Sequence, residues 1–237
     1  MAEWRALMDP GTELGVAQIK LAWWREEITR MTAGSPIHPI TLYLAHLPSG
    51  CTHDLAPLTA SVDAAAAHVA GVPLERAVEL QSHAGALYGT PLLMAALLGA
   101  YRGEPERLRA CVGALAAAQY LTRAAADYVR EARAGRIPFA VDELLAAGID
   151  NNDLVAREPP PRLCAYLDDL MHRAAGHFAI AADALAPAER PNQRHLLVLA
   201  ALGQKQLSGR KNRLSADFRW ADLYNAWNTA RRAAAAR

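Results

Sequence analysis

The stretch PERLRACVGALAAAQYLTRAAADYVREARAG, residues 105–135, decides the fold class of this chain. It opens with a proline, which the first turn of a helix tolerates, and closes with a glycine, which favours a helix end. Between them alanine, leucine and other unbranched side chains dominate, and these lose little conformational entropy in a helix. The stretch predicts one long helix over residues 105–134, which we expect to be central and largely buried.

The rest of the chain also favours helices. Of its 237 residues 52% are apolar and only 6% aromatic, enough to bury a substantial core. No run of alternating β-branched residues indicates a strand, and no polar, low-complexity segment indicates a linker. We therefore expect one all-α domain over residues 1–237. The further expected helices are residues 13–32 capped by Thr12, short helices after Pro39, Val141 and Asn152, residues 56–70, a helix opened by Pro73 and bent at Gly89–Pro91, and residues 162–186, 189–208 and 215–235.

Net charge, cysteine content and the apolar segments of the chain indicate which partners and which compartment to expect. A formal charge of +1 argues against a general nucleic-acid binder, so we expect no nucleic-acid partner. The cysteines, Cys51, Cys111 and Cys164, are odd in number, lack metal-ligand spacing and suit a reducing compartment. The N-terminus lacks the apolar core of a signal peptide, and the longest apolar run is too short to span a bilayer. These features predict a cytoplasmic protein, which could also lie on a membrane surface.

The C-terminal part of the chain is basic. From Lys205 to Arg237 there are eight Lys or Arg residues against Asp217 and Asp222, a net charge of +6. An amphipathic basic helix with aromatic residues can rest on anionic lipid. The alternative is a helix that closes the bundle while its arginines keep the surface soluble. The sequence leaves both interpretations open.

Two segments carry a resemblance to a known family. IKLAWWREEITRMTAGSPIHPIT, residues 19–41, and DYVREARAGRIPFAVDELLAAGI, residues 127–149, resemble segments of the squalene/phytoene synthase family, and the tail NRLSADFRWADLYNAW is similar to the family's closing basic helix. The nearest resemblance is to bacterial squalene-forming synthases of the hopanoid pathway. It implies the all-α isoprenoid-synthase fold, a helical bundle around an apolar cavity, here with a short N-terminal part.

The resemblance also implies a chemistry. In active members two Asp-rich motifs hold Mg²⁺ ions that bind the diphosphates of two prenyl substrates, and ionisation is followed by head-to-head condensation. Hard cations held by carboxylate oxygens neutralise the charge of the departing diphosphate. If this chain is active, the resemblance therefore implies Mg²⁺ as its cofactor.

The second Asp-rich motif is degenerate in this chain. Set against the family's D-x-x-E-D, Asp127 keeps the first acid, Arg130 replaces the next, and Glu131 replaces the last aspartate. Asp127 and Glu131 are the candidate metal ligands. Arg136, which matches a family arginine near the diphosphate, and Arg123 are the candidate diphosphate-binding residues.

Each of these residues has a simpler explanation. Arg123, Asp127 and Glu131 are spaced four residues apart, so they could form a solvated ion ladder on one helix face. Arg136 could merely interact with a helix C-terminus. Because of these alternatives, no residue is assigned a catalytic role.

The first Asp-rich motif is missing from its expected place. Only 22 residues precede Trp23, and in an ungapped alignment Asp9 falls near the last aspartate of the motif while Arg5 stands one turn earlier. The motif is either lost or encoded upstream of Met1.

Other patterns favour structural roles. Asp168, Asp169 and His172 mimic an Asp-rich box, but we expect a solvated face there, and surface residues rather than a zinc site for His46, Cys51 and His53. We expect His83 to line a pocket or the core. Of the adjacent Trp23 and Trp24, one should be buried and the other partly exposed, because neighbours on a helix point in different directions.

The leading hypothesis is a divergent family protein with lost or impaired prenyl transfer. It would bind an apolar, isoprenoid-like ligand or a protein partner, as does a family member with degraded Asp motifs that assists assembly of respiratory complex I. The alternative is an active Mg²⁺-dependent head-to-head prenyltransferase acting on farnesyl or geranylgeranyl diphosphate, either alone or completed by a partner subunit.

Overall fold

A computed structural model describes residues 2–46, 55–209 and 220–235, and within these ranges the regular secondary structure is entirely helical. An isolated parallel bridge joins Leu74 to Ala140. The elements are α1 (Ala2–Leu7), α2 (Leu14–Thr32), α3 (Pro39–Ala45), α4 (Leu58–Val69), α5 (Ala77–Ala84), the π-helix η1 (Gly85–Gly89), α6 (Thr90–Leu98), α7 (Pro105–Arg133), α8 (Val141–Ala146), α9 (Asn151–Val155), α10 (Pro161–Ala184), the 3-10 turn η2 (Pro187–Glu189), α11 (Arg194–Gly209) and α12 (Trp220–Ala235).

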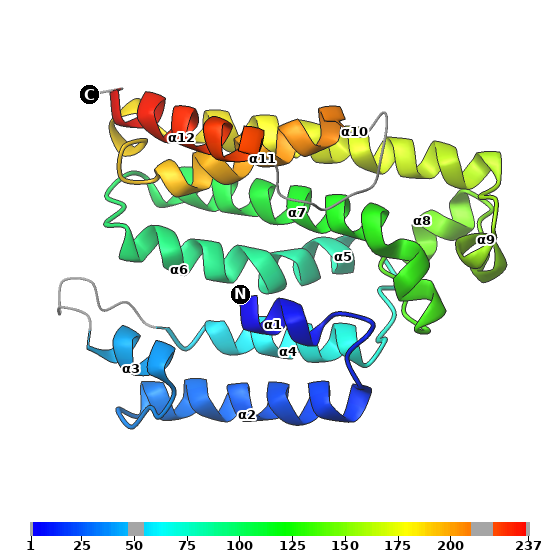
Figure 1. Ribbon diagram of the computed structural model, residues 1–237, viewed down its shortest axis with the longest axis horizontal. Coiled ribbons are helices and arrows are strands. Elements are labelled where there is room, and N and C mark those ends of the chain that lie inside the picture. The colour runs from blue at the N-terminus through cyan, green and yellow to red at the C-terminus, as the bar shows by residue number, and fades with distance from the viewer. Residues whose placement is uncertain (1, 47–54, 210–219, 236–237) are drawn as a thin grey trace.

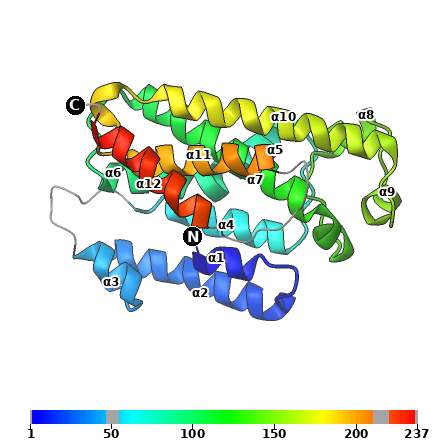
Figure 2. The same cartoon turned by 45° about the horizontal axis from the view of Figure 1, so that its top comes forward.

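Helix α7 runs through the middle of the bundle, as predicted from its sequence. Figures 1 and 2 show α10 lying along it, with α11 and α12 on the same side and α4 and α2 on the other. Its alanine-rich face is buried, with Leu115 and Ala118 fully inaccessible to solvent. The helix ends where Gly135 adopts a left-handed φ of +75°, which glycine accepts without strain.

The core has two parts that meet along α7. One gathers buried residues of α2, α4 and the C-terminal half of α7 with those of the N-terminal half of α10, and the other those of the C-terminal half of α10, α11 and the N-terminal half of α7. Leu93, Leu97 and Leu207 pack against both parts. The two halves of the bundle are therefore joined by continuous apolar packing.

A buried carboxylate holds helix α2, which carries Trp23 and Trp24, to the turn that follows it. Glu27 is inaccessible to solvent and accepts hydrogen bonds from the backbone amides of Ile37 and His38, each at 2.8 Å, and from the Thr41 hydroxyl. Trp24 is buried and lies 4.6 Å from the His38 ring between centroids. These contacts hold the C-terminal half of α2 against the turn before α3.

Three details of the helix prediction were wrong. Thr12 does not cap α2: its hydroxyl donates to the Ala6 carbonyl, and Glu13 stands at the N-cap. Pro73 does not open α5, because the chain stays extended through the Leu74 bridge and the helix begins at Ala77. The irregularity expected at Gly89–Pro91 lies one turn earlier, as the π-helix η1.

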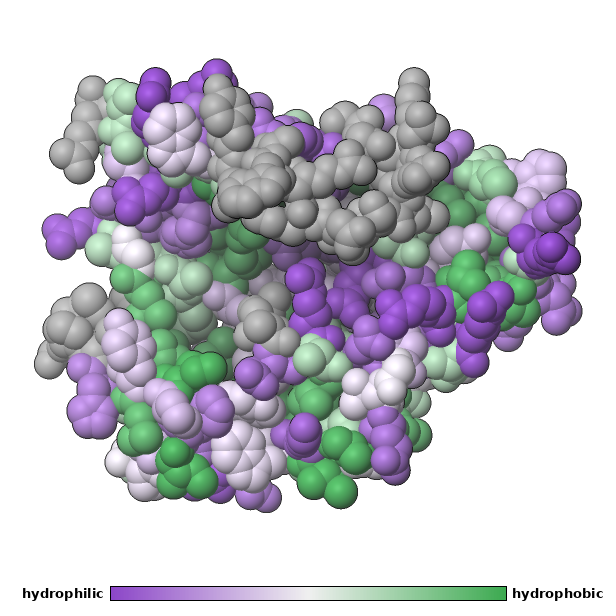
Figure 3. All heavy atoms as spheres, in the orientation of Figure 1, coloured by the Kyte–Doolittle hydropathy of each residue, from purple (hydrophilic) through white to green (hydrophobic). Residues whose placement is uncertain are grey.

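The surface is uneven in polarity. Figure 3 shows hydrophilic residues gathered across the middle of one face, over the C-terminal half of α7, and apolar residues over α2 and α3. The exposed apolar side chains of these two helices and the turn between them include Ile19, Ile37, Ile40 and Tyr43. Among the described residues, no helix combines the length and hydropathy required to cross a bilayer.

Candidate functional site

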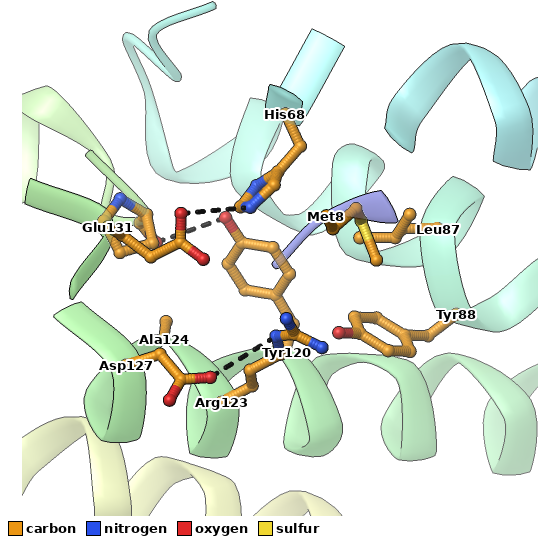
Figure 4. Close-up of a pocket in the computed structure, with 10 residues that line it drawn as sticks. Met8, His68, Leu87, Tyr88, Tyr120, Arg123, Ala124, Asp127 and Glu131 are labelled. Atoms are coloured by element: carbon orange, nitrogen blue, oxygen red, sulfur yellow. Dashed lines mark hydrogen bonds and ion pairs between the residues drawn. The ribbon is translucent and has the colours of Figure 1, made fainter. Parts of the chain in front are cut away.

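A pocket forms where the C-terminal half of α7 faces η1, α4 and the residue that follows α1. It is lined by Met8, His68, Leu87, Tyr88, Tyr120, Arg123, Ala124, Asp127, Glu131 and Pro138 (Figure 4). Three of the four residues singled out from the sequence, Arg123, Asp127 and Glu131, therefore lie in one place. The free space inside the pocket holds about one water molecule. As it stands, the pocket is almost filled by its own side chains.

Arg123 and Asp127 form one side of the pocket. The Arg123 Nε lies 3.6 Å from the Asp127 Oδ2, so this half of the ion ladder predicted from the sequence is present. Figure 4 shows the guanidinium of Arg123 between Asp127 and the hydroxyl of Tyr88. Burial raises the pKa of Tyr88, and the neighbouring Arg123 opposes part of that rise. Tyr88 is therefore a neutral hydroxyl at physiological pH.

Glu131 is turned away from Asp127 and is buried. Its Oε2 lies 2.7 Å from Arg136 Nε and 3.4 Å from His68 Nε2. Burial alone would raise the pKa of Glu131, but the hydrogen bond and charge of His68 and the charge of Arg136 hold it below the ordinary value of 4.5. The solvated ladder therefore stops at Asp127, and that interpretation was wrong for Glu131.

Arg136 is also buried, and its Nη2 donates to the Met8 carbonyl at 3.4 Å. The sequence placed this arginine beside a diphosphate or near a helix C-terminus. In the structure its guanidinium joins the carboxylate of Glu131 to the backbone that follows α1. Arg136 lines a second, smaller hollow next to the pocket, together with His68 and His83.

Arg130, which replaces an acid of the family pattern, contacts Asp9 across the bundle. Its Nη2 donates to both carboxylate oxygens of Asp9, at 2.8 and 2.9 Å, and its Nη1 lies 4.0 Å from Asp127 Oδ1. The hydrogen bonds from the Gly11 amide and from Arg130 lower the pKa of Asp9. Two positions that the alignment assigns to opposing acidic motifs are thus occupied by an acid and an arginine bound to each other.

His68 and His83 stack beneath this cluster, with ring centroids 6.2 Å apart. Burial, and to a lesser degree the charge of His68, lower the pKa of His83 from 6.5 to about 4. Tyr120 lies edge-on to His83 and donates its hydroxyl hydrogen to the Pro138 carbonyl at 3.2 Å. His83 therefore lines a hollow, as predicted, and is neutral at physiological pH.

The side chains do not fit a Mg²⁺ ion. Magnesium requires about six oxygen ligands in near-octahedral geometry, of which carboxylates supply the charge. Asp127 is already paired with Arg123 and Arg130, and Glu131 is buried against Arg136. In the described part of the chain, no three acidic, histidine or cysteine side chains converge into a group that could hold a metal.

The other residues singled out from the sequence lie elsewhere. Asp168, Asp169 and His172 are exposed on α10, where Asp169 lies 3.6 Å from Arg173. His46 Nδ1 lies 2.7 Å from the Leu42 carbonyl oxygen, while Cys51 and His53 fall outside the described residues.

Sequence reasoning missed several pocket residues, including Met8, His68 and Tyr88. His68 stands in an alanine-rich run with no neighbouring polar residue, and Met8 and Tyr88 look like ordinary core residues. Their distance from Asp127 in the sequence left no local signal. The weak signal available was that His68 interrupts a run of alanines and that Tyr88 stands between two glycines close to it in sequence.

Comparison with known proteins identifies the family. The profile of the family described as squalene/phytoene synthase matches residues 5–219. The chain belongs to the squalene/phytoene synthase family. Among solved structures it is similar to a dehydrosqualene synthase crystallised in complex with a ligand, with a TM-score of 0.74 and 16% identity over 99% of this chain and 83% of that chain. No curated protein matches the chain.

The structural match confirms the expected fold, the all-α isoprenoid-synthase bundle. Within this squalene/phytoene synthase fold the pocket beside α7 is surrounded by arginines as well as acids. The two carboxylates that line the pocket, Asp127 and Glu131, each lie within 4.0 Å of an arginine nitrogen, and so does Asp9, the neighbour of the pocket residue Met8. This arrangement distinguishes the site from a cluster of free carboxylates.

Proposed function

We propose that this chain is a non-catalytic member of the squalene/phytoene synthase family that acts by binding. The observation that carries the proposal is the ion pairing at the pocket: Glu131 is buried against Arg136, and Asp9 is bound by Arg130 through both oxygens. When a diphosphate departs, metal cations must neutralise its negative charge. Carboxylates that are free of other partners hold these cations in place. Here arginines of the chain itself neutralise the carboxylates.

The binding role follows from the lining of the pocket. Leu87, Ala124, Pro138 and the rings of Tyr88 and Tyr120 supply apolar surface to the pocket lining, among the charged groups of Arg123, Asp127 and Glu131. A related structure of the same fold holds a ligand. We therefore propose an apolar, isoprenoid-like molecule as the ligand, with Arg123 and Arg136 as candidate contacts for its polar end.

A protein partner is the second candidate for the bound molecule. Exposed apolar residues on α2, α3 and the turn between them, among them Ile19, Ile40 and Tyr43, support this proposal, because a large exposed apolar surface is a common feature of interaction sites. Such a role would resemble that of an assembly factor. It would use the scaffold without its chemistry.

The enzymatic alternative is retained because Arg123, Asp127 and Glu131 line one pocket. In that case Mg²⁺ would have to displace the arginines from Asp127 and Glu131. Calorimetric titration of Mg²⁺ into the wild type and into Asp127→Asn tests whether Mg²⁺ can displace the arginines. We expect no saturable binding to either protein at millimolar Mg²⁺.

The decisive experiment is a turnover assay. Purified protein is incubated with Mg²⁺ and farnesyl or geranylgeranyl diphosphate, and both pyrophosphate release and C30 or C40 products are measured. We expect neither. Turnover that is abolished by Asp127→Ala would overturn the proposal and establish the prenyltransferase alternative.

The proposal includes a single domain and a cytoplasmic or peripheral location. Leu93, Leu97 and Leu207 pack against both parts of the core, which supports cooperative folding of residues 1–237 as one unit. One unfolding transition, seen at the same denaturant concentration by circular dichroism and by tryptophan fluorescence, is the expected result. Peripheral membrane contact is proposed for the basic C-terminal helix.

A further inference from the structure

The residue that follows α1 occupies the pocket. Met8 is 3% exposed and lines the pocket beside Leu87 and Tyr88, and Figure 4 shows its side chain next to that of Leu87, at the apolar end. Met8 belongs to the short connection between α1 and α2, not to a helix. Methionine is flexible and fills irregular apolar gaps readily. The space that Met8 fills is continuous with the pocket lining.

Two arginines hold this connection in place, one exposed and one buried. Arg130 binds the carboxylate of Asp9 at 2.8 and 2.9 Å, and Arg136 donates to the Met8 carbonyl at 3.4 Å. Asp9 also accepts a hydrogen bond from the Gly11 amide at 2.8 Å, which fixes the turn. Both arginines come from the C-terminal end of α7 and the turn that follows it. The connection is therefore fastened to the same element that carries the charged side of the pocket.

The ends of the connection are anchored independently of the pocket. Trp4 of α1 is buried and meets Trp24 of α2 edge-on at 6.0 Å between ring centroids. This contact keeps α1 against α2 whether or not Met8 fills the pocket. Displacement of Met8 from the pocket would therefore leave the contact between the two flanking helices in place, although the connection is also hydrogen-bonded to α1 through the Met8 and Asp9 amides.

We propose that Met8–Gly11 is a removable plug, with Met8 as its stopper and the Asp9–Arg130 ion pair as its latch, and that apolar molecules enter the pocket only when the latch opens. This deepens the proposed binding role and rests on it, since it assigns the pocket to a ligand. The plug explains how a pocket with room for about one water molecule can accept a larger molecule.

The strength of the latch suits reversible opening. The side chains of Arg130 and Asp9 are 55% and 45% exposed, and ion pairs this open to solvent contribute little because water and salt screen them. Burial of the Met8 side chain favours the closed state more strongly. The open state is then a minor population. A ligand that fills the space left by Met8 binds the open state and shifts the equilibrium towards it.

The test uses an uncharged, fluorescent apolar dye, N-phenyl-1-naphthylamine, titrated into the full chain. We expect the latch variants Asp9→Asn and Arg130→Gln to bind the dye about 2- to 5-fold more tightly than the wild type, the gain that loss of an exposed ion pair allows. Hydrogen exchange should be faster at the amides of Met8, Asp9, Gly11 and Thr12 in both variants, and unchanged in α10. The matched control is Asp63→Asn, which breaks the similarly exposed Arg25–Asp63 pair, 2.8 Å long, and should leave dye affinity unchanged.

A second substitution locates the dye. Ala124 lines the pocket at the end opposite Met8, so Ala124→Leu in the Asp9→Asn background should take up pocket volume that the dye needs and return its affinity towards the wild-type value. Unchanged affinity in both latch variants, an equal gain in Asp63→Asn, or a gain that survives Ala124→Leu would each overturn the plug. The dye carries no diphosphate, so these results are separate from the turnover assay: prenyl transfer by the wild type would end the proposed function and leave the plug standing.

Discussion

The guanidinium of Arg136 lies against the carboxylate of Glu131, with Nε 2.7 Å from Oε2, and both side chains are buried. Gly135, with its φ of +75°, turns the chain so that the residue after it folds back onto the last turns of α7. A buried ion pair contributes little net stability compared with an apolar pair, but removing one partner leaves an uncompensated buried charge. The pair is thus more sensitive to single than to double substitution.

Substitution of Arg136 by methionine should therefore destabilise the fold by about 3–5 kcal/mol, measured by urea unfolding, because Glu131 keeps its charge without its partner. The double variant Glu131→Gln/Arg136→Met should lose less stability than Arg136→Met alone. Arg133→Met, on the exposed side of the same helix end, is the matched control and should change stability by no more than about 0.5 kcal/mol. Strictly additive effects of the two single substitutions would contradict the coupling.

Close packing between α10 and α11 gives a second prediction. A Cβ added at Gly203 would lie 2.1 Å from the Phe178 Cζ, and the Phe178 ring is buried and cannot move aside. Gly203→Ala should therefore destabilise the protein by about 1–3 kcal/mol in thermal or urea unfolding. Gly176→Ala is the control: Gly176 lies inside α10 with no neighbouring atom within 4 Å of the added Cβ, and alanine there should be neutral or stabilising. Equal effects at the two positions would show that helix propensity, not the contact with Phe178, is responsible.

The sequence predicted the helical fold well because the signals for helices are local. The proline and glycine that bound α7, and the small side chains between them, determine its limits without reference to the rest of the chain. Thr12 misled because its hydroxyl bonds backward to Ala6, a choice that depends on how α1 packs. Pro73 misled because the chain there pairs with Ala140, far along the sequence.

The candidate site was predicted only in part. Spacing correctly brought Arg123 next to Asp127, since residues four apart on a helix are neighbours. It could not show that Glu131 turns inward to Arg136, because that depends on the burial created by α4. The bond between Asp9 and Arg130, 121 residues apart, had no local signal at all. Long-range ion pairs are set by tertiary packing, which spacing does not report.

The buried carboxylate of Glu27 predicts a specific acid response. Burial alone would raise its pKa, but hydrogen bonds from Thr41, from the His38 and Ile37 amides and from Arg30 lower it to about 2, below the ordinary value of 4.5. The folded state therefore favours the ionised form, so its contribution to stability is complete above about pH 4.5 and is lost as the pH falls towards 2. Glu27→Gln should be destabilised at pH 6 and should lose less further stability between pH 4.5 and 3 than the wild type.

The neighbouring Glu26 provides the control for this response. Its side chain is 72% exposed, so Glu26→Gln should leave both the stability at pH 6 and the acid slope nearly unchanged. Urea unfolding at a series of pH values measures both. An acid slope that is the same in Glu27→Gln and in the wild type would contradict the assignment.

His83 predicts a pH response in a higher range. Burial lowers its pKa from 6.5 to about 4, so the unfolded chain binds a proton there before the folded one does. Stability should therefore fall as the pH drops from about 6.5 to 4, by up to about 3 kcal/mol from this residue. His83→Gln should reduce this loss, whereas His172→Gln, at an exposed position, should retain it in full. Identical pH profiles for the two variants would exclude His83 as the source.

The basic C-terminal helix leads to the last prediction. On α12, Trp227 is 56% exposed and the Arg231 guanidinium lies 5.0 Å from its ring, with Arg232 exposed beside it. The more N-terminal part of the predicted helix, residues 215–219, falls outside the described residues. An exposed tryptophan next to paired arginines can lie at the headgroup level of an anionic bilayer, where each arginine contributes roughly 1 kcal/mol. Sedimentation with vesicles containing phosphatidylserine should therefore recover the protein in the pellet at low salt, and less of it at physiological salt.

Replacing Arg231 and Arg232 by glutamine should abolish this association. The matched control, Arg107→Gln/Arg109→Gln, removes the same charge from the first turns of α7, at exposed positions paired with Glu104 and Glu106. If attraction to lipid depended only on net charge, both double variants would lose binding equally. If the α7 variant retains binding and the α12 variant loses it, the lipid contact is assigned to α12. Both variants remove the same charge, so only the position of the arginines beside Trp227 can explain the difference. Equal recovery of the wild type in the supernatant with neutral and anionic vesicles at low salt would exclude a membrane role for this helix.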